Sequence, residues 1–149
     1  MKDDDAALAD RLFPLIRDRL MKEPMYWGDP ARVTVDHSAY VVNALFNTSS
    51  GRIVVEPYVF FGHNVCLLAG THDVTKIDKA RQDSWPTEGC DIVIRRGVWL
   101  ASNVTVIGPA VVGEHAVVAA GSVVMGDLEP RGLYAGVPAK LVRRIETEG

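Results

Sequence analysis

The sequence predicts a mainly β protein whose short strands stack as a parallel β-helix, and three observations support this fold class. Residues 94–129 divide into six-residue units that all open on a branched aliphatic residue, namely Ile94, Leu100, Val106, Val112, Val118 and Val124. The fifth residue of every unit is small or apolar, and turn-forming pairs such as Gly108-Pro109 lie between the apolar positions. Six residues turn an α-helix by about 1.67 turns, so this period cannot mark one helix face and instead suits strands joined by tight corners.

The same six-residue phase predicts how far the β-helix extends. It opens weakly at Val35 and Val41, with Ala39 and Leu45 in the fifth places, breaks over residues 47–54, and returns from Val55. Together with the later units this gives eleven or twelve hexads, which make about four coils at three hexads per coil. We therefore expect a single domain, residues 1–149, in which the β-helix spans residues 33–129.

A polar segment, residues 73–91, interrupts the repeat and contains Trp85-Pro86. Repeat proteins eject such segments as loops from one face, which is often the binding face. Because the segment directly follows His72, we expect a looped-out insertion with a role in function.

The two ends of the chain are predicted to be helical. Residues 3–21 place leucines near a 3.6-residue period after three aspartates, and Pro14 predicts either a kink or a junction of two short helices. We expect residues 1–32 to form a helical cap and a loop, in which Tyr26 and Trp27 pack against the core rather than line a sugar site. Residues 130–149 are expected to form a turn and a short helix.

Composition and charge exclude several classes of function. Hydrophobic residues make up 48% of the chain and aromatic residues only 7%, which indicates an aliphatic core. The net charge of −3 gives no electrostatic case for nucleic acid binding. No apolar run approaches the roughly 20 residues of a membrane span, and the N-terminus is acidic, so we expect a cytoplasmic protein. Cys66 and Cys90 have no metal-ligand spacing and are expected to be free thiols.

Three stretches resemble a known family: FGHNVCLLAGTHD at 61–73 with the insertion after it, the repeats at 97–124, and AGVPAK at 135–140. With them, the chain resembles the hexapeptide-repeat acyltransferases, which include galactoside, maltose and xenobiotic acetyltransferases and sugar O-acetyltransferases. The resemblance covers residues 33–145 and implies a left-handed coil, contrary to the general preference for right-handed crossovers.

The resemblance also implies an activity and an assembly. It implies transfer of an acetyl group from acetyl-CoA to a hydroxyl, or alternatively an amine, of a sugar-type acceptor. The assembly that it implies is a homotrimer with three sites between neighbouring subunits, and no metal is expected.

The family's motifs map onto particular residues of this chain. His72 occupies the place of the catalytic base. The residues expected to bind CoA are Trp99, Ser102, Ala120, Lys140 and Arg143, and the candidate acceptor-binding residues are Asn43, Asn47, His63 and Trp85. His63 stands at the third place of its hexad, so it either faces the same groove or lies at a corner. The register leaves open which of the two asparagines faces the site. Relatives often carry Thr-Lys where this chain has Met125-Gly126, so Lys140 and Arg143 are expected to do more of the phosphate binding.

The chemistry is consistent with these residue types. An alcohol is a poor nucleophile at neutral pH, and an imidazole, with an ordinary pKa of about 6.5, accepts its proton during attack on a thioester. Backbone N–H groups at a coil edge would stabilise the oxyanion. Cys66 as a nucleophile has no partner defined by the sequence.

Two other classes remain as alternatives. A zinc β-helix enzyme resembling the γ-class carbonic anhydrases needs three imidazoles, whereas His63 and His72 are nine residues apart and no closer pair exists. A non-catalytic β-helix scaffold would need neither His72 at the insertion nor the basic turn after AGVPAK.

Overall fold

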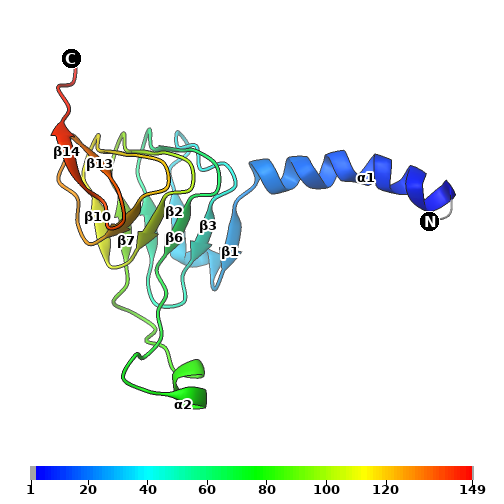
Figure 1. Cartoon of the computed structure of the whole chain (residues 1–149), viewed down its shortest axis with the longest axis horizontal. Coiled ribbons are helices and arrows are strands. Elements are labelled where there is room, and N and C mark those ends of the chain that lie inside the picture. Colours follow the sequence, from blue (N-terminus) through cyan, green and yellow to red (C-terminus); the bar gives the residue numbers. More distant parts are fainter. Residues whose placement is uncertain (1–2, 149) are drawn as a thin grey trace.

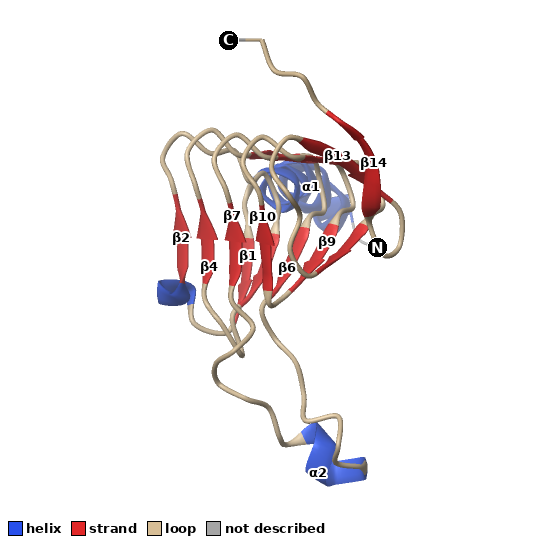
Figure 2. Cartoon of the chain, turned by 90° about the vertical axis from the view of Figure 1, so that its left-hand side faces the viewer, coloured by secondary structure: helices blue, strands red, loops and turns tan. Residues whose placement is uncertain are grey.

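The computed structural model describes residues 3–148 and contains three sheets that form the sides of a triangular prism (Figures 1 and 2). All strand pairs in it are parallel except the last, which confirms the predicted parallel β-helix. Sheet A contains β1 (Met25–Trp27), β3 (Leu45–Asn47), β6 (Cys66–Leu68), β9 (Thr105–Ile107) and β12 (Val123–Met125). Sheet B contains β2 (Val33–Val35), β4 (Ile53–Val55), β7 (Ile92–Ile94) and β10 (Ala110–Val112). Sheet C contains β5 (Phe60–Phe61), β8 (Trp99–Leu100), β11 (Val117–Val118), β13 (Gly132–Ala135) and β14 (Lys140–Arg144).

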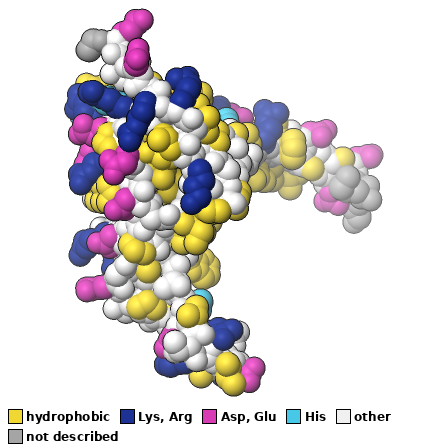
Figure 3. Space-filling model, turned by 60° about the vertical axis from the view of Figure 1, so that its left-hand side comes forward, with side chains coloured by type: hydrophobic (Ala, Val, Ile, Leu, Met, Phe, Trp, Pro, Cys, Tyr) yellow, Lys and Arg dark blue, Asp and Glu magenta, His cyan; other side chains and the backbone are white. Residues whose placement is uncertain are grey.

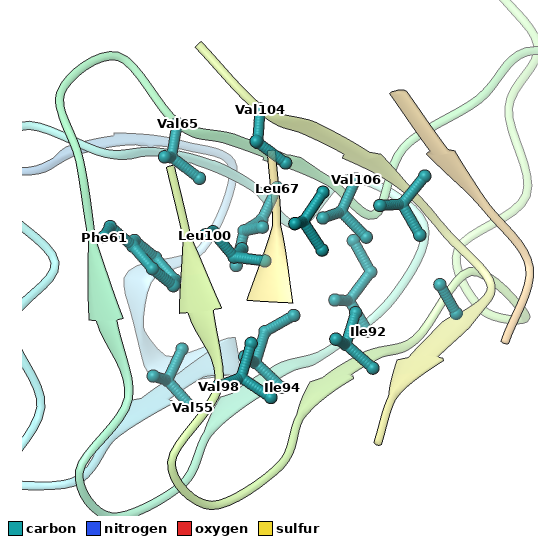
Figure 4. Close-up of a cluster of buried hydrophobic side chains, with 14 of the residues drawn as sticks. Val55, Phe61, Val65, Leu67, Ile92, Ile94, Val98, Leu100, Val104 and Val106 are labelled. Atoms are coloured by element: carbon teal, nitrogen blue, oxygen red, sulfur yellow. The ribbon is translucent and has the colours of Figure 1, made fainter. Parts of the chain in front are cut away.

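The aliphatic stripe read from the hexads is the core of the prism. All six opening residues of the units at 94–129 have no exposed surface, and the fifth residues are at most 8% exposed. Equivalent residues stack from coil to coil, as Ile94 does on Val55 and Val112 (Figure 4). Each coil therefore buries its stripe against the next one, which explains why the repeat tolerates almost no polar residue at these positions.

The corners between sheets C and A explain the turn-forming residues between the stripes. On three successive coils, Asn64, Asn103 and Gly121 occupy the left-handed backbone region, with φ of 59°, 61° and 74°. Asn and Gly adopt this conformation at lower cost than other residues. The residues at the corners and the buried aliphatic positions thus predict the same coil.

The first coil differs from the prediction in two ways. It begins at β1, inside the segment expected to be a loop, because Met25–Trp27 pairs with Leu45–Asn47. The predicted inward position of Leu45 is also wrong: Ala44 and Phe46 are fully buried, and Leu45 faces out beside Cys66. The corner before β3 is one residue shorter than the equivalent corner before β6, which shifts the phase by one residue.

The N-terminal helix α1 (Asp3–Lys22) runs unbroken through Pro14 and projects away from the open end of the coil (Figure 1). None of its residues is buried, and its leucines and Ile16 are exposed. The predicted break at Pro14 is therefore absent, and the predicted capping role is wrong for the single chain.

The insertion and the C-terminus complete the fold. Residues 73–91 leave the coil as a looped-out insertion, as predicted. They leave the prism at the edge between sheets A and B and contain the short helix α2 (Asp78–Gln82) (Figure 2). The predicted C-terminal helix is instead β14, which pairs antiparallel with β13. Residues 140–144 form a strand in spite of their helical propensity, because the backbone groups on the outer edge of β13 need hydrogen-bond partners.

Candidate active site

A cavity of about 550 Å³ lies where sheets A and B meet, at the base of the insertion. Three successive coils contribute to it through the residues that follow β1, β3 and β6, and the insertion closes one side. A volume of this size fits a small molecule of about one or two sugar units. Its lining consists of Trp27, Gly28, Asp29, Arg32, Asn47, Thr48, Ser49, Gly70, Thr71, His72 and Trp85.

His72 stands at the point where the coil ends and the insertion begins. Its Nδ1 lies 3.0 Å from the backbone oxygen of Arg81 in α2. A carbonyl oxygen only accepts hydrogen bonds, so Nδ1 carries a proton and the Nε2 of the neutral ring has a free lone pair. Trp85 packs edge-on against the imidazole, with ring centroids 6.1 Å apart. The structure therefore places an oriented imidazole, with the lone pair of Nε2 free, at the wall of a cavity.

Two tryptophans on the cavity present open rings. Trp27 is 69% exposed and Trp85 is 51% exposed. The expectation that Trp27 packs against the core is wrong, whereas its neighbour Tyr26 does stack on the core residue Phe46, with centroids 5.5 Å apart. The two side chains separate because β1 is a strand, and successive side chains of a strand point to opposite faces. The alternation of side chains along a strand could have predicted the exposure of Trp27, but this segment was expected to be a loop.

Asn47, at the end of β3, is the asparagine that lies on the cavity. Its Oδ1 accepts hydrogen bonds from the N–H and the hydroxyl of Ser49, at 3.0 and 2.8 Å. These bonds leave Nδ2 without a partner among the described residues and available to a ligand. Gly70 makes room for the amide, because a Cβ at that residue would lie 2.7 Å from Asn47 Oδ1.

Asp29 and Arg32 are cavity residues that the sequence did not single out. Arg32 donates to the backbone oxygen of Thr48 on the coil and to that of Thr87 on the returning limb of the insertion, both at 2.9 Å. Asp29 accepts from the N–H of Ala31 at 2.9 Å. The guanidinium thus fastens the insertion to the prism. Only the fold reveals this role, because Arg32 and Thr87 are 55 residues apart.

The insertion itself is held by polar contacts. Residues 74–83 are all exposed, so no apolar burial stabilises this limb. Asp73 accepts from the N–H and hydroxyl of Thr75, and these bonds lower the pKa of its carboxyl group. Lys76 donates to the hydroxyl of Ser84 at 2.8 Å. The geometry around His72 therefore depends on hydrogen bonds rather than on a packed core.

The other predicted residues lie along a different edge, where sheet C turns into sheet A. Asn43 is buried there in a mutual pair with Asn64, in which each donates to the other at 2.9 Å. The backbone N–H of His63 donates to Ser102 Oγ at 3.1 Å, and the N–H of Gly121, beside Ala120, donates to the backbone oxygen of Ser102. Of the four predicted acceptor residues, the structure thus brings only Asn47 and Trp85 to His72.

The predicted CoA residues continue along this second edge. Ser102 and Ala120 lie on successive coils. The turn that leads to Lys140 is bonded to the coil of Ala120, because the N–H of Gly136 donates to Ser122 Oγ at 3.1 Å. Trp99 lies beside the edge on sheet C and stacks on Phe60, with centroids 5.6 Å apart. Lys140 and Arg143 are exposed on β14, at the end of the molecule where lysines and arginines gather in Figure 3.

The two edges bound the same sheet from opposite sides. The strands of sheet A are three residues long, or about 10 Å. Within one chain, the cavity around His72 and the edge with Ser102 and Ala120 therefore do not form one pocket.

The geometry gives no support to a zinc site. Among residues 3–148, no group of three or more His, Cys, Asp and Glu side chains is placed to hold a metal ion. His63 and His72, the two histidines of the zinc alternative, lie on the two different edges. The described part of the chain also contains no helix with the length and apolar character needed to cross a membrane.

Comparisons with known proteins agree with the fold and with the repeat. Residues 91–126 match the family model described as bacterial transferase hexapeptide (six repeats). An acetyltransferase from Vibrio cholerae O1 biovar eltor, containing the hexapeptide repeat and solved in complex with acetyl coenzyme A, superposes with a TM-score of 0.57 at 23% identity, over 93% of this chain and 79% of that one. The fold is thus the left-handed β-helix of such enzymes, and the resemblance to the hexapeptide-repeat acyltransferases is confirmed.

Two curated relatives extend the comparison. A protein of Schizosaccharomyces pombe, whose own assignment as an acetyltransferase is provisional, is 36% identical over 96 residues, which are 64% of this chain and 45% of that protein. The galactoside O-acetyltransferase of Escherichia coli K12 is 24% identical over 140 residues, which are 93% of this chain and 68% of that protein. This chain thus spans about half the length of the first of these relatives.

Proposed function

We propose that this chain is a CoA-dependent O-acetyltransferase, which moves an acetyl group from acetyl-CoA to a hydroxyl of a sugar-type acceptor. One observation carries the proposal: an imidazole with a fixed Nδ1 proton shares a cavity with a free amide donor and two open tryptophan rings. Aromatic faces of this kind suit the apolar faces of sugar rings, and the amide suits their hydroxyl groups. The acetyl-CoA complex of the Vibrio cholerae enzyme supports the choice of donor.

In the proposed reaction, His72 Nε2 accepts the proton of the acceptor hydroxyl as its oxygen attacks the thioester carbon. The C–S bond then breaks, and the thiolate of CoA takes the proton from the imidazolium. The products are an acetyl ester and free CoA, and the reaction needs neither a covalent enzyme intermediate nor a metal. Attack by an amine in place of the hydroxyl would follow the same route.

We further propose that the active enzyme is a homotrimer, because one chain separates the two halves of the site. If the cavity edge of one subunit faces the Ser102–Ala120 edge of the next, each site takes its base from one chain and its donor groove from the other. Both edges border sheet A, so this arrangement turns sheet A toward the threefold axis. Its outer face offers partly exposed apolar side chains for that contact, among them Leu45, Leu68, Ile107 and Val123. The cytoplasmic location stays a prediction from the sequence.

A complementation experiment tests the shared site. His72→Ala removes the base and Ala120→Trp fills the donor edge, so each variant alone should release almost no CoA thiol from acetyl-CoA with a panel of simple and nucleotide sugars. If neighbours share sites and the chains mix at random, co-refolding equal amounts restores one intact site in four, or about a quarter of wild-type activity. A mixture without activity, or a stable wild-type monomer in light scattering, would refute the shared site. A wild-type protein that releases no thiol with any hydroxyl or amine acceptor would refute the activity.

A further inference from the structure

We infer that Arg81 is a positioning residue for the base: its side chain holds the insertion in the one arrangement that fixes the tautomer of His72. This inference deepens the proposed function and rests on it for the catalytic consequence. Within residues 3–148, the imidazole of His72 makes one hydrogen bond, and its acceptor is a main-chain oxygen in an exposed helix.

That oxygen needs support that α2 does not provide. The N–H of Ser84 donates to that oxygen at 3.3 Å, but this bond lies within the insertion itself and does not anchor α2. The helix has five residues and none is buried, so neither length nor packing holds it in place. The limb that precedes it, residues 74–77, is exposed as well. A carbonyl that moves by an ångström would no longer accept from Nδ1, because hydrogen bonds weaken steeply beyond about 3.2 Å.

The guanidinium of Arg81 supplies the support. Its Nε donates to the backbone oxygen of Lys76, and its Nη2 donates to that of Val74 at 3.2 Å. One side chain therefore ties α2 to the outgoing limb of the insertion, two residues after His72. Arg81 also contacts His72 directly, since its backbone carbonyl accepts the hydrogen bond from the imidazole Nδ1. The planar fork of arginine suits two carbonyls at once, which an ammonium group cannot match.

The consequence concerns the proton on the ring. With the Arg81 carbonyl in place, Nδ1 keeps its proton and every neutral His72 has Nε2 ready as the base. Without the guanidinium of Arg81, the carbonyl of residue 81 moves. The neutral imidazole then divides between its two tautomers, one of which has no lone pair on Nε2. Donor binding should be unaffected, because in the proposed trimer the donor groove of each site is formed by the Ser102–Ala120 edge of the neighbouring chain, which Arg81 does not touch.

The same helix offers a matched control. Lys79 is an exposed cation of α2 like Arg81, but within residues 3–148 its ammonium pairs only with Asp83, four residues on in the same segment. Lys79→Ala removes a charge and an ion pair from the helix without touching the carbonyls of Val74 and Lys76. Arg81→Lys keeps the charge and loses the fork.

The experiment combines nitrogen-15 NMR of the resting protein, labelled on histidine, with steady-state kinetics. His72→Gln assigns the His72 signals. Wild type and Lys79→Ala should show one neutral tautomer with the proton on Nδ1, whereas Arg81→Ala should show averaged ring shifts. The kcat of Arg81→Ala should fall about tenfold to a hundredfold, as for other partners that orient a functional imidazole. The KM for acetyl-CoA should stay within about twofold, and Arg81→Lys should be intermediate.

Several results would overturn the inference. The wild type could already sample both tautomers, or Arg81→Ala could keep the wild-type shifts and kcat. Lys79→Ala could also lose the single tautomer and kcat to the same extent as Arg81→Ala. The spectra need no substrate, so they separate this inference from the proposed function. A chain that transfers no acetyl group but loses its single tautomer in Arg81→Ala would refute the activity and leave the role of Arg81 standing.

Discussion

The coil and the insertion are stabilised by opposite means. In the coil, aliphatic residues such as Leu100 and Val118 are fully buried and stack on their equivalents in neighbouring coils. In the insertion, residues 74–83 are all exposed and are held by side-chain hydrogen bonds, by the Lys79–Asp83 pair and by Arg32 at the base. A change in the coil should therefore alter folding, whereas a change in the insertion should alter chemistry while the fold remains.

The largest expected effect is on folding. Val118→Asp would place an unpaired carboxylate among aliphatic side chains, and we expect it to lower the free energy of unfolding by about 4 kcal/mol or more. Val117→Asp is the matched control, because Val117 precedes it on β11 and faces outward. Urea denaturation followed by circular dichroism measures both. Equal midpoints for the two variants would contradict the assigned stripe.

The next effect is on turnover alone. We expect His72→Ala to lower kcat by about 10²–10⁴-fold, because a general base contributes that much to a transfer of this kind. Its melting temperature and its binding of CoA should remain those of the wild type. His63→Ala, on the other edge, should change kcat little. A reversal of the two results would move the base to the Ser102 edge.

The tryptophans should separate the two substrates. Trp85→Ala and Trp27→Ala remove rings from the cavity, and we expect each to raise the KM for the acceptor by about tenfold, since aromatic stacking contributes roughly 0.5–1.5 kcal/mol beyond area. Trp99→Ala, on sheet C, should change the KM for acetyl-CoA instead. If all three variants affect the same substrate, the two edges are not distinct in function.

A smaller effect is expected at the C-terminal strand. Lys140→Ala combined with Arg143→Ala should raise the KM for acetyl-CoA by a few-fold and leave kcat nearly unchanged, because cations that contact phosphate contribute mainly to binding. Arg144→Ala is the control, since that guanidinium donates to the backbone oxygen of Pro130 at 3.1 Å. An unchanged KM in the double variant would mark both residues as ordinary surface charges.

The smallest effect is expected at Cys66. Burial raises the pKa of its thiol above the ordinary value, so the group is protonated and a poor nucleophile at neutral pH. Cys66→Ala should therefore keep wild-type kcat, and iodoacetamide should modify the native protein slowly. Loss of turnover in this variant would restore the covalent route through Cys66 that the sequence left without a partner.

The two regions differ, for a physical reason, in how much of their structure can be predicted from the sequence. In the coil, each apolar position is repeated every six residues and buried for the same cause each time, so the pattern predicts the core directly. It failed where a corner lost one residue, at Leu45, and where a strand edge recruited β14 in place of a helix. In the insertion, the contacts join residues without a common period, as Arg32 does with Thr87, so the sequence predicted that the segment leaves the coil but not how it is held.

The order of residues was enough to predict the stacked coil, the place of the insertion and His72 at its start, because burial in a repeat recurs at regular intervals along the chain. Which of the predicted residues lie around one cavity follows from the three-dimensional fold. It put Asn47, Trp27 and Trp85 with His72, and it put Asn43, His63, Ser102 and Ala120 along another edge. The reason is the triangular cross-section: residues a few positions apart in sequence turn onto different sides of the prism, whereas residues about twenty positions apart stack on the same edge.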